Sequence, residues 1–181
     1  MMAMWKQAPG LTRAAFVWVV GFGVLATVWY VAEVIRDPGG VAGGLLSAAV
    51  VAAIVLLTLV VLRLPDASGR ILDGAVVVVV ALAVLGAFTS VTTGWGPGTA
   101  VAAFVVAVPI AFLGLREPRH AAILLLVAGV APLLERVGRA LSQGEGPVLH
   151  GIGGSAGAVA LPLIVGGVLF LLAGRVDRRM L

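Results

Sequence analysis

The feature that most constrains this chain is its series of long apolar runs, which leave almost no polar surface. Of its 181 residues, 61% are hydrophobic and only 11% are charged, whereas a soluble domain carries about 25% charged residues. A chain of this length normally forms one domain, but this one has too little polar surface to keep a domain in water. We therefore expect residues 1–181 to form a single integral membrane domain.

Six apolar runs are long enough, or nearly long enough, to cross a bilayer as helices. A spanning helix needs about 20 mostly apolar residues, whereas a membrane β-strand would alternate apolar and polar side chains. The runs are continuous, so the sequence predicts an all-α, polytopic transmembrane bundle with short connections. The expected spans are residues 14–35, 41–62, 71–91, 99–115, 121–140 and 152–173, of which the fourth is the shortest.

The basic residues predict that both termini are cytoplasmic, because Lys and Arg favour the cytoplasmic side of membrane spans. Nine of the twelve lie in the tails and in the connections after the second and fourth spans: Lys6, Arg13, Arg63, Arg70, Arg116, Arg119, Arg175, Arg178 and Arg179. Only Arg36, Arg136 and Arg139 fall on the other side. The net charge of +4 is therefore a topology signal, and no nucleic-acid partner is expected.

Small residues in the second and sixth spans predict close helix packing, because membrane helices associate through small residues at four-residue spacing. The candidate packing residues are Gly39, Gly40, Gly43, Gly44, Gly153 and Gly157. Three prolines, Pro109, Pro132 and Pro162, lie inside the last three spans. Each removes a helical hydrogen bond and can kink its helix. The three prolines are therefore either static kinks or hinges about which the C-terminal half of the protein moves.

Ionisable residues inside the hydrocarbon are the default functional candidates, because burying them is costly. Five are expected on the outer side: Glu33, Glu135, Arg136, Arg139 and His150. This cluster would hold an anionic or zwitterionic ligand or pass a proton. In the alternative interpretation, the arginines extend to lipid headgroups and the glutamates partner them at the ends of helices.

Two polar features are expected on the inner side. Asp73 follows Arg70 and Asp66 near the start of the third span, a pattern typical of a capped, charge-paired helix start. His120 is expected to be a solvated residue of the connection before the fifth span. Both predictions are structural rather than functional.

The residue pattern excludes several chemistries. Cysteine is absent, which removes thiolate metal sites and disulfides, and neither a zinc-binding helix motif nor a phosphate-binding loop occurs. We therefore expect no cofactor and no metal, assign no catalytic residue, and consider an enzyme the less favoured class.

Three functions remain open. The first is a small transporter, a channel or the membrane component of a transport complex, of unknown substrate. The second is a non-catalytic accessory or scaffold subunit that binds other membrane subunits or a second copy of itself. The third is a membrane-embedded enzyme that acts on a lipid or isoprenoid with Glu33 or Glu135 as the acid. The expected location is the plasma membrane of a high-GC bacterium. The chain is rich in Ala, Val, Leu, Gly and Arg and contains a single Lys, a composition that resembles the proteins of such bacteria.

Overall fold

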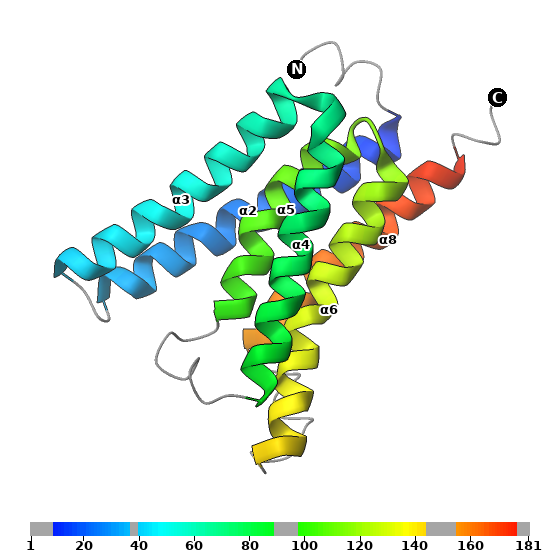
Figure 1. Cartoon of the computed structure of the whole chain (residues 1–181). Helices are drawn as coiled ribbons and strands as arrows, with labels where there is room; N and C mark the ends of the chain where they lie inside the picture. The colour runs from blue at the N-terminus through cyan, green and yellow to red at the C-terminus, as the bar shows by residue number, and fades with distance from the viewer. Residues whose placement is uncertain (1–8, 37–39, 89–97, 144–154, 177–181) are drawn as a thin grey trace.

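The protein is a bundle of α-helices. The computed structural model describes residues 9–36, 40–88, 98–143 and 155–176, and six helices follow one another within these ranges (Figure 1). They are α2 (Gly10–Arg36), α3 (Gly40–Arg63), α4 (Pro65–Phe88), α5 (Gly98–Gly114), α6 (Pro118–Gln143) and α8 (Ser155–Val176). The predicted all-α bundle is confirmed.

Five of these helices are long and apolar enough to cross a membrane, and α5 is the shorter one. Its 17 residues extend about 25 Å, less than a hydrocarbon core of about 30 Å. The length criterion therefore supports five of the six predicted spans. The fourth span, and the cytoplasmic placement of both termini, stay predictions.

The short helix α5 lies at the centre of the bundle, where it contacts all five other described helices. Ala103, Ala107 and Ile110 on α5 are completely buried. Small alanine side chains allow the neighbouring helices to approach closely. Since protein surrounds α5, its length matters less than that of a helix exposed to lipid.

The surface of the bundle is apolar. Large side chains such as Val41, Leu56 and Phe88 are well exposed, and only 11% of the most apolar window of α3 is buried, against 56% for α8. A water-soluble monomer rarely exposes apolar surface on this scale. The outward surface is that of a membrane-embedded protein.

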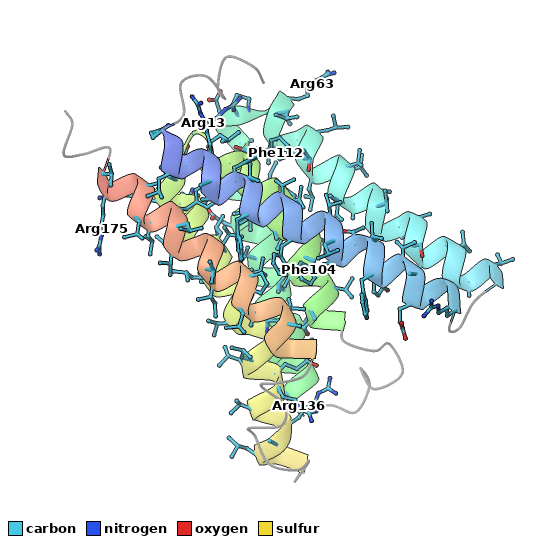
Figure 2. The ribbon with its side chains drawn as sticks, turned by 180° about the vertical axis from the view of Figure 1, so that it is seen from behind. Arg13, Arg63, Phe104, Phe112, Arg136 and Arg175 are labelled. Carbon is cyan, nitrogen blue, oxygen red and sulfur yellow. The ribbon has the colours of Figure 1, made fainter. Side chains whose placement is uncertain are left out.

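The helices gather at one end of the bundle and diverge at the other. The start of α2 and the end of α8 lie at the same end, which we call the terminal end (Figure 1). Toward the opposite, distal end, α2 and α3 lean away from α4 and α6, as both views show (Figures 1 and 2). Figure 2 also shows Arg13, Arg63 and Arg175 at the terminal end and Arg136 at the distal end.

Two connections at the terminal end are tight turns that place proline at the first position of the next helix. Pro65 begins α4 and Pro118 begins α6, and proline is favoured there because its missing N–H would have no helical partner. The amide of Ser68 donates to the carbonyl of Leu64 at 2.9 Å. Because Pro65 starts the helix, α4 begins before the predicted Ile71.

Other helix ends differ less from the predicted spans. The helix α2 begins at Gly10 rather than at Ala14, and α6 begins at Pro118 rather than at Ala121. Each earlier start adds residues that the hydropathy criterion left out because polar groups lie among them. Residues 89–91 of the third predicted span and 152–154 of the sixth lie outside the described residues.

Glycines bring the backbones of α6 and α8 close together. A Cβ added to Gly167 would lie 2.8 Å from Cγ of Leu126 and 3.1 Å from the carbonyl oxygen of Ala122. A Cβ on Gly129 would lie 3.0 Å from Cβ of Leu163. If either glycine carried a side chain, the two helices would have to separate, because their crossing leaves no space for a methyl group.

The glycines singled out in the sequence have different surroundings. Gly43 and Gly157 are buried, but Gly40 and Gly44 are exposed, and a Cβ on either would meet no atom of the chain within 4 Å. Gly40 begins α3 with a φ of 59°, in the left-handed region that favours glycine. Gly39 and Gly153 lie outside the described residues. A packing role for these glycines stays a prediction.

The three predicted hinge prolines lie in helices that pack on one another. Pro109, Pro132 and Pro162 are buried inside α5, α6 and α8. The indole Nε1 of Trp18 donates to the carbonyl oxygen of Pro162 at 3.0 Å, which ties α2 to α8. Whether these prolines act as hinges or as static kinks stays open.

We expect Gly167→Ala to destabilise the bundle, because the added methyl group must displace Leu126 or the α6 backbone. The expected loss is about 1–3 kcal/mol, measured by thermal or SDS-induced unfolding of the purified protein in detergent. Gly74→Ala is the matched control, since a Cβ there meets nothing within 4 Å. Equal stability of the two variants would contradict the close helix crossing.

Candidate functional site

A charged pair is buried inside the distal end of the bundle. Glu135 on α6 is only 8% exposed, and its Oε1 accepts a hydrogen bond from Nη2 of Arg139, one helical turn later. Both side chains are more than four-fifths buried. Burying a carboxylate is costly unless it is paired and hydrogen-bonded, and Arg139 supplies both interactions.

Arg139 also connects α6 to the end of α4. Its Nε donates to the carbonyl oxygen of Gly86 at 3.0 Å. Gly86 lies in the last turn of α4, where carbonyl groups lack intrahelical donors and a positive charge is favourable at the negative end of the helix dipole. A Cβ on Gly86 would lie 2.7 Å from Oε1 of Glu135, so the carboxylate occupies space that a side chain at position 86 would need.

The buried pair borders a small polar cavity of about 80 Å³, which we call the arginine cavity. Its lining consists of Ala100, Pro132, Glu135, Arg136 and Arg139. Two guanidinium groups and one carboxylate give this lining a net positive charge. Arg136 lies at the distal end of α6, below the start of α5 in Figure 2. The cavity has room for a few water molecules or one small polar group.

A larger and almost entirely apolar groove lies between α2, α5 and α8, on the side where α2 leans away. We call it the α2 groove; its volume is about 480 Å³. Its lining is Phe22, Leu25, Ala26, Trp29, Tyr30, Glu33, Ala100, Val101, Phe104, Ala158 and Val159. From Phe22 to Glu33 the groove follows α2 for about 16 Å, roughly half of the hydrocarbon core. Ala100 lines both this groove and the arginine cavity.

A second apolar groove of about 410 Å³ lies on the other side of α5, between α3 and α4. We call it the α3 groove. Tyr30 and Val101 line both grooves, so the two hollows are neighbours. The divergence of the helices therefore leaves the distal half of α5 flanked by two apolar hollows.

The structure brings together three of the five residues predicted for the outer polar cluster. Glu135, Arg136 and Arg139 line the arginine cavity, whereas Glu33 is exposed and lines the α2 groove. His150 lies outside the described residues. A ligand-binding or proton-transfer role for these residues stays a prediction.

A second polar cluster, at the terminal end, was missed by the sequence analysis. Nε2 of His120 lies 2.6 Å from Oδ1 of Asp73, and its Nδ1 lies 3.3 Å from Oε2 of Glu117. The expectation that His120 is a solvated loop residue is wrong, because His120 is half-buried in the first turn of α6. Asp73 therefore lies near the start of α4, as predicted, and in addition forms a hydrogen bond with His120 of α6.

The signal for this contact is Gly69, one turn before Asp73. A Cβ there would lie 3.1 Å from Cε1 of His120, so the glycine gives the imidazole space to lie against α4. The two partners are 47 positions apart in the sequence, and only the parallel packing of α4 and α6 brings them together.

The helix α6 caps two other helices. At the terminal end, Nε of Arg119 donates to the carbonyl oxygen of Gly174 in the last turns of α8 at 3.4 Å, as Arg139 does for Gly86 at the distal end. The polar contacts of His120 and Arg139 are about 28 Å apart along α6. This spacing is close to the thickness of the hydrocarbon core. We therefore expect one polar cluster at each of the two membrane–water interfaces.

Comparison of the chain with protein-family models, with curated proteins and with solved structures finds no match. Within the described ranges, no group of three or more His, Asp or Glu side chains is placed to hold a metal ion. The arrangement offers a small polar hollow lined by two arginines and a glutamate, next to an apolar groove.

We expect a double-mutant cycle on Glu135 and Arg139 to show strong coupling. Glu135→Leu leaves the buried guanidinium without its carboxylate, and Arg139→Leu leaves the carboxylate without its cation, so each single variant should lose about 3–5 kcal/mol. The double variant should lose less than the sum of the two losses. The measurement is unfolding in detergent, and additive losses would show that the pair does not form.

We expect Asp73→Asn to be more destabilising than Glu117→Gln. The Asp73 contact is shorter, less exposed and joins two helices, so its loss should cost about 1 kcal/mol. The Glu117 contact lies on the surface within one helix and should change stability by less than about 0.5 kcal/mol. The same unfolding assay measures both. The reverse order would mean that His120 does not connect α4 to α6.

Proposed function

We propose that this protein is a small membrane transport protein whose substrate is a long-chain amphiphile. The observation that carries the proposal is the α2 groove, an apolar hollow of about 480 Å³ on the side of a helical, apolar bundle. Its volume lies in the range of sites that bind small molecules, about 300–1,000 Å³. In a bilayer such a hollow is filled by a hydrocarbon chain.

The length of the groove supports an occupant drawn from one leaflet. It follows α2 from Phe22 to Glu33, about 16 Å, which corresponds to half of the hydrocarbon core. It lies at the distal half of the bundle, where α2 leans away from α4 and α6 (Figures 1 and 2). A lipid chain would enter this groove sideways from the bilayer.

The order of side chains along the groove matches an amphiphile. Phe22 and Leu25 lie toward the middle of α2, whereas Trp29, Tyr30 and Glu33 lie toward its distal end. Trp and Tyr are enriched where membrane meets water, and a carboxylate is also favourable there. The chain of the occupant would therefore lie among the apolar residues, and its polar end among the last residues of α2.

Prolines in the helices that form the groove walls favour transport over permanent binding, because they would allow these walls to bend. The walls opposite α2 are formed by α5 and α8, which contain Pro109 and Pro162. Proline-interrupted helices bend at the position of the missing hydrogen bond. Bending of α5 or α8 against α2 would widen or narrow the groove.

A second candidate function is an accessory subunit that binds another membrane protein through α3. The observation that favours it is the exposure of α3, together with the open space around Gly40 and Gly44, since small residues let a second helix approach. The enzyme alternative has less support, because Arg139 already binds Oε1 of Glu135. That leaves Glu33 as its acid.

We expect Ala158→Trp, which fills the α2 groove from α8, to reduce lipid binding and lipid transfer by about tenfold, the equivalent of roughly 1.4 kcal/mol. Lipids that co-purify in mild detergent would be quantified by mass spectrometry, and transfer would be followed with a fluorescent phospholipid in proteoliposomes. Ala81→Trp is the matched control, because Ala81 is exposed on α4 and lines neither groove.

Two outcomes would contradict the proposal. Equal binding and transfer by the two tryptophan variants would show that the groove holds no substrate. Co-purification of another membrane protein in stoichiometric amount, together with no lipid transfer by the wild type, would support the accessory function instead.

A further inference from the structure

The polar cluster at the terminal end places a carboxylate oxygen at each of the two ring nitrogens of His120. Nε2 lies 2.6 Å from Oδ1 of Asp73, and Nδ1 lies 3.3 Å from Oε2 of Glu117. An ionised carboxylate can only accept hydrogen bonds, and a neutral imidazole carries a proton on only one of its nitrogens. Both contacts are therefore hydrogen bonds only when the ring carries two protons and a positive charge.

We propose that His120, Asp73 and Glu117, which we call the histidine clamp, form a proton-binding site that controls how firmly α4 is joined to α6 at the terminal end. The ligand is a proton from the aqueous phase on that side of the membrane. This site does not depend on the proposed transport of an amphiphile.

The position of His120 gives protons access to the clamp. Its side chain is 32% exposed, in the first turn of α6 and before the apolar run of residues 121–140. Histidine is the side chain that normally gains or loses a proton between about pH 5 and pH 8. The clamp therefore combines solvent access with a group that titrates near neutral pH.

Loss of the proton would weaken the contact between the two helices. The Asp73 contact joins α4 to α6, and a hydrogen bond between ionised partners is roughly twice as strong as a neutral one. A neutral ring would keep one hydrogen bond at most, without its charge. Because a Cβ on Gly69 would lie 3.1 Å from Cε1 of His120, the ring lies directly against α4, and the weaker contact acts on that helix.

The carboxylates of Asp73 and Glu117 supply the charges that act on His120. The helix α5 also packs on α6 but contains no ionisable side chain, and Arg119 donates to the carbonyl oxygen of Gly174 on α8. Arginine keeps its proton throughout this pH range. The other charged residues at this end, on the helices packed against α6 and in the turn before it, are Asp66, Arg70, Arg116 and Arg175.

The direction of the pH response follows from proton linkage. The folded clamp holds the proton between two carboxylates, whereas the imidazole of an unfolded chain faces water, so the folded state binds the proton more tightly. The stability that the clamp supplies is therefore present at low pH. It is lost as the pH rises through the titration midpoint of His120.

The first test measures the titration of His120 by NMR on the full-length protein in detergent micelles. The chain contains two histidines, so labelled histidine gives two signals, and His150→Gln identifies them. We expect Asp73→Asn to lower the midpoint of His120 by about one pH unit. Glu117→Gln should lower it less, because that contact is longer and the carboxylate is more exposed. Asp66→Asn is the matched control, which removes the same charge from α4 outside the clamp and should leave the midpoint nearly unchanged.

The second test measures the separation of α4 and α6 with pairs of spin labels. The chain has no cysteine, so Ile71→Cys with Ile123→Cys labels the terminal halves of the two helices, and Val84→Cys with Leu134→Cys labels their distal halves. All four positions are exposed. From about pH 5 to about pH 9, across the histidine range, we expect the distance distribution of the terminal pair to broaden or lengthen.

The distal pair is the control for the spin-label experiment. Its distances should not change with pH, because the distal contact joins Arg139 to the carbonyl oxygen of Gly86 and involves no histidine. His120→Gln should abolish the change of the terminal pair, since this side chain does not titrate.

Three results would overturn the proposal. The first is a His120 midpoint that Asp73→Asn leaves unchanged. The second is an equal shift in Asp66→Asn, which would reflect surface charge rather than the clamp. The third is a terminal-pair distance that does not depend on pH in the wild-type background.

Discussion

Hydrocarbon cannot form hydrogen bonds, and this constraint governs the positions of the charged groups in this protein. A charge within a membrane span must either reach the rim or find a partner inside the protein. Glu135 forms an ion pair with Arg139, and Arg139 also donates a hydrogen bond to the carbonyl oxygen of Gly86. At the terminal end, His120 forms a hydrogen bond with Asp73. As a result, α6 holds α4 in parallel at both ends, with an apolar interface between the two contacts.

The same solvent explains why glycine and alanine determine the packing. Lipid chains are as apolar as leucine, so helices gain little from burying large side chains and gain mainly from close contact. Gly167 and Gly129 allow α6 and α8 to cross closely, and the alanines of α5 let five helices surround it. Close packing is therefore strongest around α5, α6 and α8, while α3 remains largely exposed.

The proposed function follows from where the packing stops. The helices are held together at the terminal end, and α2 and α3 lean away at the distal end (Figures 1 and 2). That divergence leaves an apolar groove on each side of α5, and the polar contacts of α6 place the arginine cavity beside one of them. The chain of an amphiphilic substrate would occupy such a groove, which a scaffold subunit would not need.

The sequence by itself determined the solvent, the helical class and the approximate positions of the helices, because apolar runs are local properties of the chain. The four-residue spacing of Glu135 and Arg139 also places them on one face of a helix, where they can pair. The sequence could not indicate that Asp73 meets His120, that Gly86 accommodates Glu135, or that Ala100 lines two hollows. Those contacts depend on how far one helix slides and tilts against another. Interhelical register in lipid is set by the summed shape of many small side chains, and so only the tertiary structure decided it.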